Sequence, residues 1–207
     1  DAATLLLNPV SLVEWNLHKS YLRDLEAKGA RTLTTLWLDA ATPEAIAAAF
    51  ETLGGDDLVF KRQVGAGAEG QLRLVRGEVA PDMPHPMMVQ RFEPAILGEG
   101  EQSYIFIDGE FSHGLTKHAA NGDYRIQSTY GGTERILQPS GTDLETAKSI
   151  LAMLDTVPLY ARVDMLRAQD GGLMLMELEL VEPFLYPLQG PKLGERIVSA
   201  LRRRIAH

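Results

Sequence analysis

Residues 159–183, LYARVDMLRAQDGGLMLMELELVEP, place two apolar runs on either side of the Asp-Gly-Gly turn at 170–172. A turn of this kind between apolar runs predicts a β-hairpin. Side chains alternate between the two faces of a strand, so Glu177 and Glu179 share one face of the second strand. If the strands pair in simple register, Asp164 of the first strand joins them, and three carboxylates meet on one side of a sheet.

Three neighbouring carboxylates need a compensating positive charge. Like charges raise one another's pKa, whereas a divalent cation with oxygen ligands removes this penalty. Mg²⁺ is the natural candidate, and because it is usually held by one or two carboxylates together with substrate phosphates, it also indicates a nucleotide. An ordinary amphipathic strand explains the hairpin about equally well. In that case the two glutamates face solvent, and Arg162 simply pairs with Asp164.

The composition is typical of a globular protein. The chain has 207 residues, 45% of them hydrophobic and 23% charged, with a net charge of −8 and no cysteine. The negative charge argues against a nucleic-acid partner, and the lack of cysteine excludes disulfides and thiolate nucleophiles. We find no signal peptide and no apolar run long enough to span a bilayer, so we expect a cytoplasmic protein without a membrane partner.

A loop of small residues at 64–70 lies between two short β runs at 57–62 and 71–75. Glycines let backbone N–H groups approach phosphate oxygens, and Lys61 supplies a positive charge at the end of the first run. Because a strand follows the loop, it is neither a Walker loop nor a dinucleotide-binding fingerprint, both of which open a helix. A bare hairpin turn is the more common explanation of such a loop.

Hydrophobic periodicity and turn residues predict the other elements. The predicted helices cover residues 15–28, 43–53, 144–154 and 192–205, and the predicted strands cover 31–38, 87–92, 103–108, 110–117 and 122–127. A proline-rich spacer at 81–86 predicts a boundary between two lobes, at 1–86 and 87–207. Lys19 lies inside the first predicted helix, where a lysine is normally solvated.

Eight features follow one another in a fixed order along the chain. They are Lys19, Lys61 with the glycine loop, MVQRF at 88–92, Glu101 ahead of YIFIDGE at 104–110, Lys117, GDYRIQ at 122–127, RVD at 162–164 and ELE at 177–179. This order resembles the ATP-grasp superfamily, most of all its prokaryotic glutathione synthetase and RimK-like branch and the group of the D-cycloserine biosynthesis ligase. The resemblance runs from about Asn8 to the C-terminus. It implies an α+β fold whose two lobes carry antiparallel sheets and enclose a nucleotide.

The resemblance implies an ADP-forming carboxylate–amine ligase that uses ATP and Mg²⁺, with Mn²⁺ as an alternative ion, and works through an acyl phosphate. The implied nucleotide-binding residues are Lys19, Lys61, Gly65, Gly67, Gly70, Gln90, Arg91, Phe92 and Glu101. Among them, the glycines would form a mobile lid, residues 90–92 the adenine hinge, and Glu101 the contact to ribose. Lys117, Arg125 and Arg162 would face the transferred phosphoryl group. The implied metal ligands are Asp164, Glu177 and Glu179.

The chain departs from the family pattern at several positions. Glu179 stands where Asn is common, and Ser103 and Gln127 replace residues of glutathione synthetases, which argues against a glutathione-type acceptor. Only eighteen residues precede Lys19, so we expect either that the usual N-terminal domain is absent or that these residues are a fragment of a longer chain. The substrates would be a small-molecule carboxylate and an amine or other nucleophile. A non-catalytic or partner-dependent ATP-binding module is the alternative, and a homodimer is compatible with the sequence.

Overall fold

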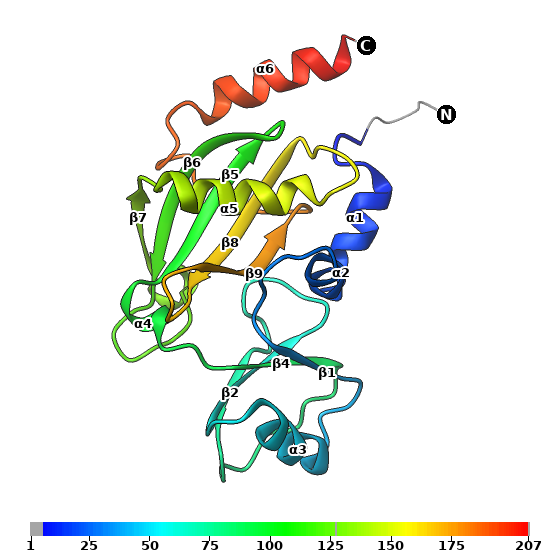
Figure 1. The fold of residues 1–207 in the computed structure, drawn as a ribbon, viewed down its shortest axis with the longest axis vertical. Helices are drawn as coiled ribbons and strands as arrows, with labels where there is room; N and C mark the ends of the chain where they lie inside the picture. Colours follow the sequence, from blue (N-terminus) through cyan, green and yellow to red (C-terminus); the bar gives the residue numbers. More distant parts are fainter. Residues whose placement is uncertain (1–5, 127, 207) are drawn as a thin grey trace.

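The computed structural model describes residues 6–126 and 128–206. Figure 1 shows two sheets one above the other, with helices packed against each. The smaller sheet has the strand order β1-β4-β2-β3, and the larger sheet has the order β7-β6-β5-β8-β9. Every pair of neighbouring strands in both sheets is antiparallel. The predicted α+β architecture with antiparallel sheets is confirmed.

The smaller sheet consists of β1 (Thr35–Leu38), β2 (Asp57–Arg62), β3 (Leu72–Val75) and β4 (Met87–Arg91), and helix α3 (Pro43–Leu53) covers one of its faces. The helix begins after Thr42, whose side chain accepts a hydrogen bond from the backbone N–H of Ala45, a common N-cap. Leu58 and Phe60 are fully buried under α3. Because side chains alternate along β2, Lys61 lies on the opposite face of this sheet.

The larger sheet consists of β5 (Glu101–Ile107), β6 (Glu110–His118), β7 (Thr133–Leu137), β8 (Tyr160–Arg167) and β9 (Leu173–Glu179). Helix α5 (Gly141–Ala152) packs on the face that contains Tyr104 and Phe106, and α6 (Leu193–Ile205) packs on the face that contains Ile105 and Ile107. Strand β7 was not predicted. It is an edge strand with mostly exposed side chains, so its sequence carries little hydrophobic alternation.

The β8–β9 hairpin forms as predicted, with one irregularity in its register. Arg162 pairs with Glu179 and Asp164 pairs with Glu177, but the register shifts between Asp164 and Met165. Such a β-bulge bends the strand and increases its twist. Simple register therefore holds at the acidic end of the hairpin and is lost toward the turn.

The helix predicted at 15–28 is two helices, α1 (Val10–Leu17) and α2 (Tyr21–Ala27), with a break around Lys19. The backbone N–H of Lys19 donates to the carbonyl oxygen of Gln63 at 2.8 Å, outside any helix. On α1, the Asn16 amide donates to the carbonyl of Leu178 at 2.8 Å and accepts from the N–H of Leu180 at 2.9 Å. These bonds pair backbone groups along the free edge of β9 and so anchor the end of α1, next to the helix break, on that strand.

The two cores do not follow the predicted boundary at residue 86. Strand β4 begins at Met87 and pairs with β1 and β2 of the smaller sheet. Residues of α2, including Leu22 and Leu25, belong to the core of the larger sheet. The chain therefore starts on the larger sheet, crosses to the smaller one, and returns after β4. The short α4 (Ala95–Gly98) follows this return.

The prediction of a strand at 122–127 is wrong for residues 122–126, the part that the structure describes. Residues 122–126 form a loop ahead of a short 3-10 helix, η1 (Ser128–Tyr130), and Gln127 lies outside the described residues. The Asp123 side chain accepts hydrogen bonds from the backbone N–H groups of Tyr124 and Arg125. Such local bonds compete with strand pairing. Within the described ranges, no helix has the length and apolar character needed to cross a bilayer.

Candidate functional site

A cavity of about 320 Å³ lies between the two sheets. Residues from both lobes line it, including almost all of those predicted for the site: Lys19, Lys61, Gly65, Gly67, Gln90, Arg91, Phe92, Glu101, Lys117, Arg125, Arg162, Asp164, Glu177 and Glu179. Gly70 is the one predicted residue outside this lining, at the far end of the glycine loop. The structure thus brings together residues that are up to 160 positions apart in sequence.

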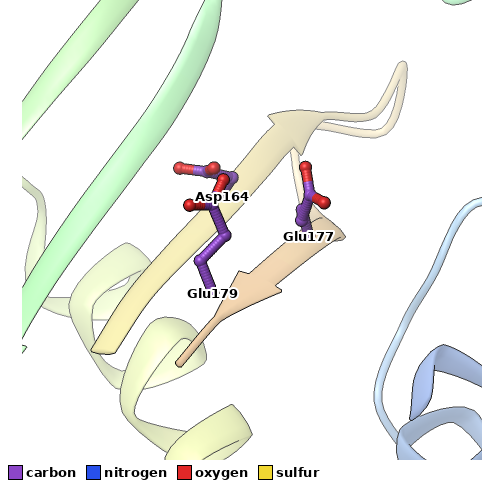
Figure 2. A group of neighbouring side chains, drawn as sticks. All are labelled: Asp164, Glu177 and Glu179. Carbon is purple, nitrogen blue, oxygen red and sulfur yellow. The ribbon is translucent and has the colours of Figure 1, made fainter. Parts of the chain in front are cut away.

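Asp164, Glu177 and Glu179 each offer a carboxylate oxygen, and these oxygens lie within 4.8 Å of one another. Figure 2 shows the three side chains on one side of the hairpin, Asp164 on β8 and the two glutamates on β9. Asp164 is only 1% exposed. The predicted convergence of carboxylates is present in the structure, and their role as metal ligands remains a prediction.

Cationic side chains lie between these acids. The Arg162 guanidinium donates to Asp164 at 2.8 Å and also pairs with Glu179. Lys19, at the helix break, pairs with Glu177. The pairing of Arg162 with Asp164 agrees with the plain amphipathic-strand explanation, but both side chains are buried and the glutamates line a cavity. A solvated strand face therefore does not account for this arrangement.

The acids remain crowded despite these partners. The pKa of Glu179 is raised to about 8, mainly by burial and further by the neighbouring Glu177 and Asp164, while Arg162 acts to lower it. Burial alone would raise the pKa of Asp164 as well, but Arg162 lowers it well below its usual value. Lys19 likewise holds the pKa of Glu177 below its usual value, against the effect of burial. Further positive charge at this point would stabilise the ionised acids.

A second buried ion pair lies beside the first cluster. Lys117, on β6, pairs with Glu101 of β5, and its ammonium nitrogen is 3.3 Å from an Asp164 oxygen. The Ser103 hydroxyl donates to Asp164. Glu101 is 6% exposed, and burial raises its pKa although Lys117 acts to lower it. The structure therefore places Glu101 within a charge network, and its contact to ribose remains a prediction.

Lys61 enters the cavity from the smaller sheet. Unlike Lys19 and Lys117, it forms no ion pair with a carboxylate in the described part of the chain. Burial lowers the pKa of Lys61, and Glu177 only partly offsets this effect. A partly buried ammonium group without a close acidic partner favours an anionic ligand.

The glycine loop forms one wall of the cavity through residues 65–69. Its base is closed by an ion pair of 3.0 Å between Arg62 and Glu69. Gly70 has a φ of +67°, and a Cβ at this position would collide with the Arg62 guanidinium. The backbone conformation therefore favours glycine at residue 70, and any larger residue would also have to displace the flexible Arg62 side chain.

Residues 90–92 connect the two lobes along the cavity. Gln90 is 2% exposed, and its amide donates to the Thr35 hydroxyl at 2.9 Å. The backbone N–H of Phe92 donates to the carbonyl of Asp57 at 2.9 Å. Both contacts fix the segment rigidly, while its hinge role remains a prediction.

Arg125 lines the cavity, but its guanidinium is held within its own loop. It donates to Asp123 at 2.8 Å and lies 3.7 Å from the ring centroid of Tyr130. Its contact with a phosphoryl group, predicted from sequence, would require this pairing to open.

Several cavity residues were missed by sequence reasoning. They are Arg62, Tyr124, Glu182, Phe184 and Tyr186, and Ser103 was missed as a partner of Asp164. Ser103 pairs directly with Asp164 across β5 and β8, which only the strand order reveals. Tyr124 lies within GDYRIQ, a predicted motif, and could have been included on that ground.

Comparisons with known proteins were made across the whole chain. No family model matches it. The cycloserine biosynthesis protein DcsG of Streptomyces lavendulae is 27% identical over 98% of this chain and 74% of its own length. The crystal structure of D-cycloserine synthetase DcsG has a TM-score of 0.81 and 25% identity, covering 97% of this chain and 74% of that one. The resemblance to the ATP-grasp superfamily is confirmed.

Two further ATP-grasp comparisons agree with this assignment. A glutathione synthetase of Prochlorococcus marinus (strain MIT 9313) is 26% identical over 97% of this chain and 65% of its own length. The ATP-grasp ligase PsnB, solved with a precursor variant, Mg and ADP, shares the fold with a TM-score of 0.68 at 18% identity, over 96% of this chain and 63% of that one. The chain thus spans between about two thirds and three quarters of these relatives.

Proposed function

We propose that the protein is an ATP-dependent, ADP-forming ligase that joins a carboxylate to an amine or another nucleophile through an acyl phosphate. One observation carries this proposal: three carboxylates converge beside buried cations in a cavity that both sheets line. Relatives named as a D-cycloserine synthetase and a glutathione synthetase support the same reaction class.

The acidic cluster suits a divalent cation. Asp164, Glu177 and Glu179 provide oxygen donors within 4.8 Å of one another, and oxygen is the ligand that Mg²⁺ prefers. Burial, together with Glu177 and Asp164, raises the pKa of Glu179, so a bound cation would favour its ionised form. We infer that these three residues would hold Mg²⁺, or Mn²⁺, which would neutralise the nucleotide phosphates. Binding would release Lys19 and Arg162 from their acidic partners.

The nucleotide would occupy the rest of the cavity. Lys61 would bind phosphate oxygens with its unpaired ammonium group, and the backbone N–H groups of residues 65–69 would add further donors. Residues 90–92 would contact the base, and Glu101 would contact the ribose. The contacts proposed for the base and the ribose rest on the order in which ATP-grasp proteins carry the corresponding residues.

The chain's own residues would catalyse the transfer by charge and position. Lys117, Arg125 and Arg162 would stabilise the negative charge of the transferred phosphoryl group, which is the main protein contribution in this chemistry. The glycine loop would exclude water and so protect an acyl phosphate from hydrolysis. No protein nucleophile is needed, which agrees with a chain that has no cysteine.

The substrates are proposed by class. They would be a small-molecule carboxylate and an amine, and neither a nucleic acid nor a membrane is expected as a partner. A cytoplasmic location and a homodimer remain predictions from sequence.

An ADP-release screen tests the proposed function. The longest natural chain containing these residues is incubated with Mg-ATP and pairs of amino acids and small carboxylates. We expect at least one pair to stimulate ADP release, and no pair to do so with Glu177→Gln. Tight binding of Mg-ATP without ADP release for any pair would instead support the nucleotide-binding module.

A further inference from the structure

We propose that Arg73 is a positioning residue that orders an aromatic wall of the cavity, made by Phe92 and Tyr124, and thereby sets the selectivity for the base. This inference rests on the proposed function, because it takes a nucleotide as the ligand of the cavity. Phe92 and Tyr124 line the cavity, whereas Arg73 lies behind them on β3.

The first step in the argument is the stacking of Arg73 on both rings. Its guanidinium carbon lies 3.7 Å from the ring centroid of Phe92 and 5.8 Å from that of Tyr124. The two rings meet edge to face, with centroids 6.1 Å apart and an angle of 86° between their planes. These separations are in the range of favourable cation–π and aromatic contacts.

The second step is that Asp57 fixes both the cation and the ring. Its carboxylate accepts hydrogen bonds from Arg73 Nε, at 2.9 and 3.1 Å, and from Nη2, at 2.5 Å. Its backbone carbonyl accepts from the N–H of Phe92 at 2.9 Å. A bidentate pair of this kind gives the guanidinium plane one orientation. Arg73 therefore has little freedom to leave the face of Phe92.

The third step is that the cluster joins the two lobes. Arg73 and Asp57 belong to the smaller sheet, whereas Tyr124 belongs to the loop after β6 of the larger sheet. Arg73 of the smaller sheet thus contacts a ring from each side of the cavity. We therefore expect the positions of both rings to depend on Arg73.

The same hairpin offers a matched control. Arg76 pairs with Asp56 and Glu51, and its guanidinium carbon lies 5.1 Å from the ring centroid of Phe50. Phe50 belongs to the core under α3 and is not among the residues that line the cavity. The two arginines therefore share their chemistry and differ in whether the ring faces the ligand.

The experiment measures the dissociation constants of Mg-AMPPNP and Mg-GMPPNP by calorimetry for the wild type, Arg73→Met and Arg76→Met. We expect Arg73→Met to weaken Mg-AMPPNP binding about tenfold and to reduce the preference for adenine over guanine. Arg76→Met should leave both constants unchanged. The ratio of the two constants is decisive, because general destabilisation would weaken both nucleotides alike.

Two further variants keep the test informative if Arg73→Met does not fold. Arg73→Lys retains a cation and should keep part of the base preference. Asp57→Asn retains Arg73 but loosens its orientation, and should reduce the preference by a smaller factor. Unchanged ratios in every folded variant of Arg73 and Asp57 would overturn the inference alone. A wild type that binds neither nucleotide would overturn the proposed function, and the inference with it.

Discussion

The two sheets share an antiparallel architecture but present different chemistry to the cavity between them. The larger sheet contributes buried charges, with Lys117, Arg162 and Asp164 all at most 7% exposed. The smaller sheet contributes apolar side chains, the glycine loop and a partly buried cation, Lys61. Figure 1 shows the larger sheet above the smaller one, with connecting segments running between them.

This difference indicates a division of work between the lobes. Buried charges are costly unless each has a partner, so the network on the larger sheet is fixed as a set. The smaller sheet has few ion pairs near the cavity. We expect its glycine loop, at 64–70, to adapt to a ligand. We infer that the larger sheet supplies the reaction centre and the smaller sheet covers the nucleotide.

The largest effect is expected for Glu177→Gln, which removes one carboxylate charge from the reaction centre. We expect ADP release to fall by at least about 100-fold, because both the metal charge and the pairing with Lys19 are weakened. The thermal midpoint should change little, since the side chain keeps its shape. Glu145→Gln, at an exposed surface pair with Lys148, is the control. A variant with normal turnover would refute the metal role.

Asn16→Ala tests how the larger sheet is held at its edge. The change leaves the Leu178 carbonyl and the Leu180 N–H without their partner. Because an unsatisfied buried polar group costs about 1–3 kcal/mol, we expect a loss of roughly 2–3 kcal/mol in the free energy of unfolding. Urea denaturation measures it, with the exposed Asn121→Ala as the control. Equal stability of the two variants would show that α1 does not support β9.

Lys61→Met tests the cation of the smaller sheet. We expect the affinity for Mg-AMPPNP to fall about tenfold, because a phosphate contact is lost. The free protein should be as stable as the wild type or more stable, since a partly buried charge is replaced by an apolar side chain. Calorimetry and thermal melting measure the two effects, with Lys148→Met, at a surface pair with Glu145, as the control. A less stable variant with unchanged affinity would contradict this account of Lys61.

The smallest effect is expected at Asp108, far from the cavity. Burial would raise the pKa of Asp108, but hydrogen bonds from Arg203 and Arg204 hold it below its usual value. The stabilisation is therefore complete above the unfolded pKa of about 3.9 and is lost as pH falls through the lower folded pKa.

Asp108→Asn should cost about 1 kcal/mol at neutral pH and remove this acid dependence. Asn tolerates the positive φ of 54° at this position. Urea denaturation at several pH values measures the change, and Mg-AMPPNP affinity should be unaffected. A variant with unchanged stability at neutral pH would show that the pairs are fully screened by solvent.

Much of the reaction centre could be predicted from the sequence because it depends on local alternation. Asp164, Glu177 and Glu179 lie on one hairpin, so the turn and the period of two were enough to bring them together. The glycine loop could also be recognised locally, because its small residues lie between two short β runs. Ser103 could not be assigned to Asp164, because their contact depends on the order of strands in the sheet.

Predictions failed where distant contacts override local preference. The break at Lys19 is stabilised by the carbonyl of Gln63 and by the β9 edge, neither of which the helical period of 15–28 reveals. Residues 122–126 form no strand, because the backbone N–H groups of Tyr124 and Arg125 donate to the Asp123 side chain instead. The lobe boundary at 86 was placed at a proline-rich spacer, whereas β4, which follows that spacer in the chain, still belongs to the smaller sheet.

The most direct test of the account is a crystal structure with Mn²⁺ and AMPPNP, in which anomalous scattering locates the ion. We predict a peak among the carboxylates of Asp164, Glu177 and Glu179, at about 2.1–2.2 Å from their oxygens, with the nucleotide phosphates beside it. Nucleotide bound elsewhere, with Lys19 and Arg162 still paired to the three acids and no peak between them, would contradict the central claim.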